Sequence, residues 1–286
     1  MYLQHFKRMP LKLFDVTLRD GLQSIPKIYS LVEKKDMMCD IINTHNPSSI
    51  EIGSIVSPKL LPQMADSIEL YNAVVSSKDI MNSGTDIYML TPSIKGLKIA
   101  HDNNVKNFSF ITSVSTKFQE KNINKTLDET KSEIKSMMDV VANIEDTKVK
   151  LYISCISECP IFGVTTNINI VDEILYYYYT HDELDEICLS DTCATLEYAD
   201  FKIIIDELIK RKIDINKISL HLHKQPLRYN NLRNIIIYAM KKGIYRYDVS
   251  NIPEIGGCTV TMNSTNGNLS YDQIYSSQYS MNHIIS

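Results

Sequence analysis

The sequence predicts an α/β protein that folds as a (β/α)₈ TIM barrel in a single domain spanning residues 1–286. Short β-rich runs recur along the chain, and each is followed by an amphipathic or polar helical stretch, as in βαβ units. Eight such units give about 36 residues per unit, which suits a barrel of typical size. A doubly wound open sheet is the alternative, but no G-x-G-x-x-G follows the first run, and a count of eight favours closure.

The expected elements alternate along the whole chain. We expect strands at Leu11–Thr17, Ser49–Gly53, Asp86–Leu90, Asn107–Ile111, Val149–Ile153, Glu186–Ser190, Lys217–His221 and Tyr245–Ser250. We expect helices at residues 31–44, 66–78, 94–103, 126–145, 170–182, 198–211, 228–242 and 269–282. In such a barrel the chemistry lies at the carboxyl ends of the strands, so polar residues there are the candidates for a functional site.

The composition excludes several classes of protein. Hydrophobic residues make up 44% of the chain and charged residues 22%, as in a globular protein with a sizeable core. A net charge of −4 without a basic stripe argues against a nucleic-acid partner. No apolar run approaches the roughly 18 residues of a membrane span, so we expect no membrane partner. The six cysteines and the absence of a signal peptide indicate reduced thiols and a cytoplasmic protein.

A polar cluster follows the first expected strand, where Arg19, Asp20 and Gln23 reach the barrel mouth. An Asp at a strand end can ligate a divalent metal, and a neighbouring Arg can neutralise a developing oxyanion. The alternative is an ordinary Arg–Asp surface pair in a turn that Gly21 closes.

Two further clusters lie at the ends of the last two expected strands. His221 and His223 are two residues apart on a strand, so both imidazoles face the same side and can bind one metal, unless they are core histidines. The glycine-rich loop after the last strand carries Cys258, placed to exchange a proton or act as a nucleophile, and Asn268, a potential metal ligand. The alternative for that loop is a glycine-rich turn with an incidental buried cysteine.

Together, Asp20, His221, His223 and Asn268 supply oxygen and nitrogen ligands suited to a divalent cation such as Mg²⁺ or Mn²⁺. Glu51 and Asp191 end two other strands. Either acid is a simple cap or a partner that orients a ligand.

At these residues the sequence resembles the 3-hydroxy-3-methylglutaryl-CoA lyase family, a group of metal-dependent barrels related to isopropylmalate and homocitrate synthases. The resemblance extends from about Leu11 to Tyr275. Its most specific part is IEIGSIVSPKLLPQMAD at residues 50–66, which follows the family motif I-E-x-x-S-F-V-S-P-K-x-x-P-Q-M-A-D. Supporting matches lie at Arg19–Gln23, Leu90–Gly96, Lys121–Asn124, Cys159–Pro160, Ser190–Thr192, His221–His223, Gly256–Cys258 and Gly267–Leu269.

The resemblance implies retro-Claisen cleavage of an acyl-CoA substrate, 3-hydroxy-3-methylglutaryl-CoA, into acetyl-CoA and acetoacetate. It implies that Arg19 stabilises the enolate and that Cys258 takes part in proton transfer to the carbanion. It further implies that Glu51 and Asp191 support the site, that Lys27 faces the CoA phosphates, and that Gln23 contributes to cofactor binding. A homodimer is left open.

Several positions depart from the family pattern. Lys224 replaces an Asp after the second His, the Pro-Tyr after Cys258 is lost, and Ile161 replaces a Tyr. The chain ends at Ser286, so we expect a short C-terminus. These departures leave two alternatives open: another carbon–carbon bond enzyme of the superfamily acting on an acyl-CoA or 2-oxo acid, and a catalytically degenerate barrel that binds a metal or acyl-CoA without turnover.

Overall fold

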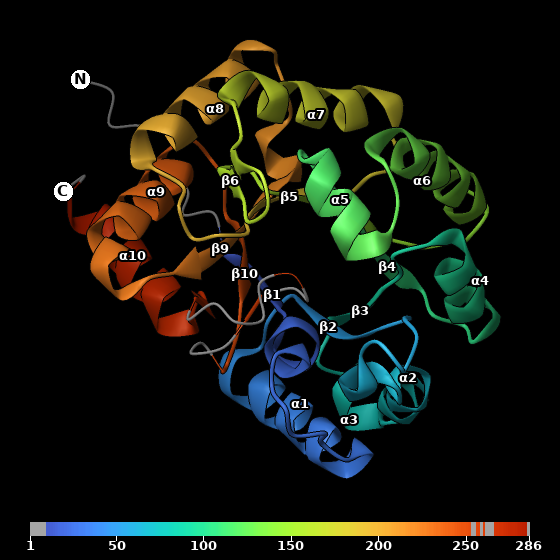
Figure 1. The fold of residues 1–286 in the computed structure, drawn as a ribbon. Coiled ribbons are helices and arrows are strands. Elements are labelled where there is room, and N and C mark those ends of the chain that lie inside the picture. Colours follow the sequence, from blue (N-terminus) through green and yellow to red (C-terminus); the bar gives the residue numbers. More distant parts are fainter. Residues whose placement is uncertain (1–9, 253–255, 258–259, 261–265, 285–286) are drawn as a thin grey trace.

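The computed structural model describes residues 10–252, 256–257, 260 and 266–284, and within them eight parallel strands form a closed barrel (Figure 1). Each strand pairs with the next along the chain, and the last pairs with both its predecessor and the first. These strands are β1 (Lys12–Asp15), β2 (Ser49–Ser54), β3 (Asp86–Leu90), β4 (Asn107–Ser113), β5 (Val149–Ser154), β8 (Glu186–Asp191), β9 (Ile218–Lys224) and β10 (Arg246–Val249). The predicted barrel is confirmed, and the open sheet is excluded.

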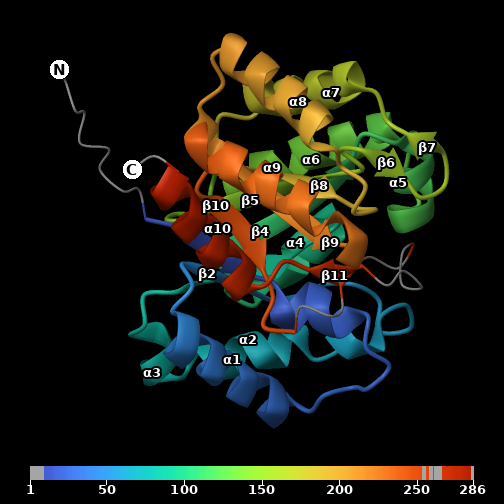
Figure 2. The same ribbon diagram turned by 90° about the vertical axis from the view of Figure 1, so that its left-hand side faces the viewer.

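Helices surround the barrel, and the last two, α9 and α10, lie side by side outside β9 and β10 (Figure 2). The sequence sets where several of them begin: Ser30 with Glu33, and Thr126 with Glu129, form reciprocal capping boxes at the first turns of α1 and α6. The helices are α1 (Leu31–His45), α2 (Ser67–Val75), α3 (Lys78–Met81), α4 (Ile94–Asp102), α5 (Thr116–Ile123), α6 (Leu127–Val141), α7 (Asn167–Thr180), α8 (Tyr198–Lys210), α9 (Tyr229–Lys241) and α10 (Tyr271–Ile284). Among the described residues, none of the helices is both long enough and apolar enough to cross a membrane.

The structure adds short elements near the mouth that the strand and helix pattern does not predict. These are α5, a hairpin of β6 (Glu158–Cys159) and β7 (Gly163–Val164), and β11 (Gly267–Asn268). A two-residue strand is too short to show a hydrophobic periodicity in the sequence, so it can be recognised only from the strand with which it pairs. In addition, β9 continues three residues beyond the predicted end at His221, which keeps His223 in the strand. β11 pairs with this extension in antiparallel register and places Asn268 opposite His223.

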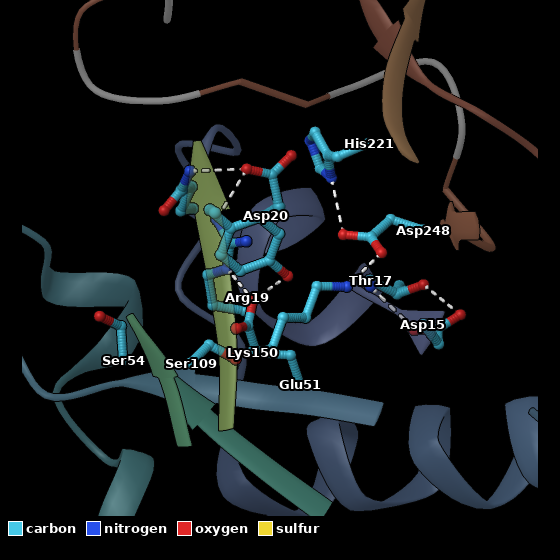
Figure 3. A network of polar contacts seen from close by, with 12 residues as sticks. Asp15, Thr17, Arg19, Asp20, Glu51, Ser54, Ser109, Lys150, His221 and Asp248 are labelled. Atoms are coloured by element: carbon cyan, nitrogen blue, oxygen red, sulfur yellow. Dashed lines mark hydrogen bonds and ion pairs between the residues drawn. The ribbon is translucent and has the colours of Figure 1, made fainter. Parts of the chain in front are cut away.

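The largest apolar cluster of described residues lies between the strands and the helices. In the barrel interior the described apolar residues form smaller clusters, such as the one formed by Phe14, Val16 and Tyr88. Barrel interiors are usually filled by branched apolar side chains. Here Glu51, Lys150 and Asp248 are almost fully buried and extend into the lumen. Lys150 on β5 pairs with Asp248 on β10, and these strands are not neighbours, so the contact crosses the interior (Figure 3).

Candidate metal centre

The first part of the site is a π-helical turn at Thr17–Gly21, which interrupts the chain directly after β1. The turn carries Arg19 and Asp20, and both side chains are buried, with 7% and 3% of each residue exposed. The Arg19 guanidinium donates through Nη1 to Asp20 Oδ1 at 2.8 Å and through Nε to the carboxylate of Glu51. A buried carboxylate and its paired cation therefore stand together at the carboxyl end of the barrel.

The second part is the His-x-His segment of β9. His221 donates from Nδ1 to Asp248 Oδ2 at 3.0 Å, and His223 donates from Nδ1 to the carbonyl oxygen of Asp191 at 2.9 Å. These contacts leave each Nε2 available as a ligand atom, as in metal sites where a second partner fixes the imidazole. His223 Nε2 is buried and has no hydrogen-bond partner among the described residues.

These parts converge. Three buried residues, Asp20, His221 and His223, each offer one potential ligand atom to the cluster. These three atoms all lie within 4.8 Å of one another. Asn268 joins them from β11, where its Nδ2 donates to Asp20 Oδ2 at 2.8 Å. All four predicted ligands therefore lie in one cluster, although they come from three distant parts of the sequence.

The protonation states in this cluster suit a divalent cation. Burial alone would raise the pKa of Asp20, but Arg19 and the two histidines hold that pKa well below its ordinary value, so the carboxylate is anionic. Burial, together with the neighbouring His221, lowers the pKa of His223 to about 4, so its imidazole is neutral. A carboxylate oxygen together with imidazole nitrogen is a donor set that Mg²⁺, Mn²⁺ or a similar cation can use.

The glycine-rich segment closes over Asp20. Gly257 donates from its backbone N–H to Asp20 Oδ2 at 3.1 Å, and its φ of 107° is a conformation that favours glycine. A Cβ at Gly256 would lie 2.7 Å from the carboxamide atoms of Asn268, so only glycine leaves room for that ligand. Cys258, which follows directly, lies outside the described residues, so its predicted role stays a prediction.

Gln23 is buried, and its side-chain amide donates hydrogen bonds within the cluster. Nε2 donates to Asp20 Oδ1 at 3.1 Å and to the carbonyl oxygen of Gly257 at 2.7 Å. Gln23 therefore links the turn after β1 to the glycine-rich segment, a contact that the sequence pattern did not reveal.

Glu51 and Asp191 occupy different places from each other. Glu51 is fully buried beneath Arg19, where its carboxylate also accepts from the hydroxyl of Tyr152 at 3.4 Å. The Asp191 carboxylate instead accepts from the hydroxyl of Ser157 at 2.6 Å and from two backbone N–H groups of its own turn. Burial raises the pKa of Asp191. It is the backbone carbonyl of Asp191, not the side chain, that orients His223.

Lys27 lies apart from the cluster, on the loop between the first turn and α1. Its ammonium group is exposed, pairs with Glu33 Oε1 at 2.7 Å and lies 4.1 Å from the centre of the Tyr29 ring. The pocket at the mouth is formed by other residues: Arg19, Asp20, Leu90, Ile111, Phe118, Tyr152, Ser154, Ser190, Thr192, His221, His223 and Gly257.

Sequence reasoning missed Asp248 and Lys150, which lie directly behind His221. Both are charged residues inside predicted strands, and a charge at a position that should be buried is a signal that was available. Tyr152 was missed as well. It contacts Arg19, whose guanidinium carbon lies 5.4 Å from the centre of the tyrosine ring.

Comparisons with known proteins indicate which family the chain is similar to. The chain is 26% identical over 266 residues to the mitochondrial hydroxymethylglutaryl-CoA lyase of Arabidopsis thaliana, covering 92% of this chain but only 53% of that protein. It is 25% identical to the 3-hydroxy-3-isohexenylglutaryl-CoA/hydroxymethylglutaryl-CoA lyase of Pseudomonas aeruginosa, covering 92% of this chain and 83% of that one.

A solved structure shares the fold. The HMG-CoA lyase of Acinetobacter baumannii, in complex with coenzyme A and 3-methylmalate, superposes with a TM-score of 0.81 at 23% identity, covering 96% of this chain and 84% of that chain. The model of the HMGL-like family matches residues 10–250, nearly the whole barrel. The chain therefore belongs to the HMGL-like family.

Proposed function

We propose that this protein is a metal-dependent carbon–carbon lyase that cleaves 3-hydroxy-3-methylglutaryl-CoA, or a close 3-hydroxyacyl-CoA, to acetyl-CoA and acetoacetate or its counterpart. The observation that carries the proposal is the convergence of Asp20, His221 and His223 within 4.8 Å beside Arg19 in the mouth pocket. Membership of the HMGL-like family and the names of the curated relatives support the same activity.

The ligands for the cation would be Asp20, His221, His223 and Asn268. Burial, the anionic Asp20 and the neutral His223 fit a divalent ion, Mg²⁺ or Mn²⁺. When bound, the cation would supply Lewis acidity that eases loss of the proton from the 3-hydroxyl of the substrate.

Arg19 is suited to stabilise the charge that cleavage creates. The 3-hydroxyl gives its proton to water and its oxygen becomes the ketone oxygen of acetoacetate. The C2–C3 bond breaks, and its electron pair stays on C2 as the enolate of the acetyl thioester. Arg19 lines the pocket with a guanidinium that Glu51 and Asp20 hold in place and that lies near the Tyr152 ring. Such a fixed cation stabilises a developing oxyanion without reorganising. A proton returned to C2 completes acetyl-CoA, and we assign that transfer to Cys258.

The walls of the pocket support a short acyl group. Leu90, Ile111 and Phe118 form an apolar wall suited to an alkyl substituent. Ser154, Ser190 and Thr192 bring hydroxyl groups suited to the polar end of an acyl chain, and Ser190 Oγ is buried without a hydrogen-bond partner among the described residues.

The coenzyme part of the substrate has its own proposed contact. Lys27 follows β1 on the side of the mouth, and its exposed ammonium group can exchange Glu33 for a phosphate of CoA. Asp191 and Gln23 would act by holding His223 and Asp20 in place. We also propose a cytoplasmic protein and keep a homodimer as a hypothesis.

The direct test is incubation of the purified protein with Mg²⁺ or Mn²⁺ and a panel of 3-hydroxyacyl-CoAs, with release of acetyl-CoA as the measured quantity. We expect cation-dependent release from 3-hydroxy-3-methylglutaryl-CoA, and none from the Asp20→Asn variant. Release from a different 3-hydroxyacyl-CoA alone would correct the substrate. No release from any of them, with the cation bound, would contradict the proposed activity.

A further inference from the structure

Behind the candidate metal centre, a chain of buried charges runs down the interior of the barrel. It begins at His221, passes to Asp248 on β10 and reaches Lys150 on β5 (Figure 3). Lys150 and Asp248 have side-chain exposures of 0% and 1%, so both charges are shielded from bulk water. A buried ion pair of this kind does not by itself imply stability, because desolvation offsets much of its attraction.

The two oxygens of Asp248 have different partners. Oδ1 accepts from the ammonium group of Lys150, and Oδ2 accepts from Nδ1 of His221 at 3.0 Å. Because a carboxylate oxygen can only accept here, His221 carries its proton on Nδ1 and turns the lone pair of Nε2 towards Asp20 and His223. Asp248 thus sets which nitrogen of His221 can ligate.

Lys150 is held on its other sides as well. Its ammonium group lies 2.9 Å from Glu186 Oε1 and 3.6 Å from the centre of the Phe14 ring. Arg246 in turn pairs with Glu186 Oε2 at 2.8 Å. Lys150 therefore has little freedom to move, and the oxygen of Asp248 that faces it must be an acceptor.

We propose that Lys150 is a positioning residue: by holding Oδ1 of Asp248, it keeps Oδ2 turned to Nδ1 of His221, and this acceptor fixes the tautomer with which His221 faces the metal centre. This inference rests on the proposed metal centre and extends it to a residue that touches neither metal nor substrate. Partners in this outer position typically change metal affinity by about 10–100-fold when they are removed.

The Asp248→Asn variant tests the role of Lys150. In Asp248→Asn, Lys150 still requires an acceptor, so the carboxamide oxygen faces Lys150 and the NH₂ group faces His221. That NH₂ group can only donate, which forces His221 into the Nε2–H tautomer and blocks its ligating nitrogen. In the double variant Lys150→Met/Asp248→Asn the carboxamide is free to turn its oxygen to His221, so the Nδ1–H tautomer returns.

The experiment measures two properties of the full chain. The tautomer of His221 is read in the metal-free protein from its ¹⁵N ring shifts, assigned by their absence in His221→Gln. The dissociation constant for Mn²⁺ is measured by calorimetry. We expect Asp248→Asn to show the Nε2–H tautomer and to bind Mn²⁺ about 10–100-fold more weakly than the parent, and the double variant to regain the Nδ1–H tautomer and most of the affinity.

A matched control comes from another buried lysine. Lys34 on α1 is 2% exposed, pairs with Asp66 and donates to the carbonyl oxygen of Gln63 at 2.7 Å, outside the barrel. Lys34→Met should lower the free energy of unfolding. It should leave the tautomer of His221 and the dissociation constant for Mn²⁺ as they are in the parent.

The outcomes separate this inference from the proposed function. If the parent binds Mn²⁺ and the double variant is no better than Asp248→Asn, Lys150 does not orient Asp248 and the inference is wrong. The same follows if Asp248→Asn keeps the Nδ1–H tautomer. A parent that shows the Nδ1–H tautomer but binds no Mn²⁺ would instead overturn the metal centre itself, and with it this role.

Discussion

The mouth and the interior of this barrel both bury charged side chains, but the partners of the buried polar groups differ between the two regions. In the interior, Lys150 faces Asp248 and Glu186, and Arg246 pairs with Glu186, so each charge meets an opposite one. At the mouth, Asp20 also pairs with Arg19, but His221 and His223 bring ligand atoms to within 4.8 Å of it, and His223 Nε2 has no hydrogen-bond partner among the described residues. Buried polar groups normally find partners, so a buried ring nitrogen that lacks one and lies in this cluster indicates a ligand. The interior is the scaffold, and the mouth is the site that it supports.

The largest effect that we expect from one side chain concerns Cys258. Loss of a positioned proton donor typically lowers a rate by about 10²–10⁴-fold, so Cys258→Ser should reduce kcat by that amount. The polar neighbours Thr259 and Thr261 argue against a structural role for this thiol, so the melting temperature should change little. Cys39→Ser, on α1, is the control and should keep the kcat of the parent. Equal acetyl-CoA release by Cys258→Ser and the parent would exclude proton transfer from this residue.

Arg19 belongs to both regions, because it pairs with Glu51 below and Asp20 above. Arg19→Met should lower kcat by about 10²–10³-fold and destabilise the fold by about 3–5 kcal/mol, since it leaves a buried carboxylate unpaired. Arg19→Met/Glu51→Gln should recover most of the stability and none of the activity. Denaturant unfolding and kcat, measured on both variants, check this separation. Recovery of activity in the double variant would show that the role of Arg19 is structural.

Asp15 tests what happens to a buried carboxylate that has hydroxyl partners instead of a cation. Its oxygens accept from Thr17 and from the hydroxyl of Tyr271 at 2.8 Å, and burial raises its pKa from 3.8 to about 6. The folded protein therefore holds this proton more tightly than the unfolded chain does. The stability that Asp15 contributes is present below pH 3.8 and is lost as the pH rises to about 6.

Asp15→Asn cannot ionise, so its stability relative to the parent should rise by about 2 kcal/mol between pH 4 and pH 7. Guanidinium unfolding of both proteins at each pH measures this difference. Asp206→Asn is the control, because hydrogen bonds from Lys202 and Lys242 hold the pKa of Asp206 below its ordinary value, so its stability relative to the parent should change little between pH 4 and pH 7. A pH-independent difference for Asp15→Asn would refute the assignment.

The smallest of these effects concerns Gly256. A Cβ there would press on the carboxamide of Asn268, so Gly256→Ala should weaken Mn²⁺ binding by about 10-fold, the loss expected when one ligand is displaced. Gly84 is the matched control, because its φ of 77° makes Gly84→Ala strained although open space surrounds its Cβ. Gly84→Ala should lower stability alone. Unchanged Mn²⁺ affinity in Gly256→Ala would show that Asn268 is not a ligand.

Sequence patterns predicted different amounts of the scaffold and of the mouth. The barrel follows from repeated strand and helix periods, and these are local properties of the chain. The cluster of Asp20, His221, His223 and Asn268 could be predicted because parallel strands bring their carboxyl ends to one mouth. The contact between Lys150 and Asp248 could not, because it joins strands that are not neighbours and depends on register across the lumen. The short β11 depends in the same way on the extension of β9.

The decisive measurement is calorimetric titration of Mn²⁺ into the parent protein and into the His221→Ala/His223→Ala variant, with circular dichroism to show that both are folded. Two of the four proposed ligands are removed, and both lie in the buried cluster at the mouth. We predict one site per chain in the parent, and affinity reduced more than about 100-fold in the variant. Unchanged binding in the folded variant would mean that the cation is held elsewhere and that the mouth of this barrel is not a metal centre.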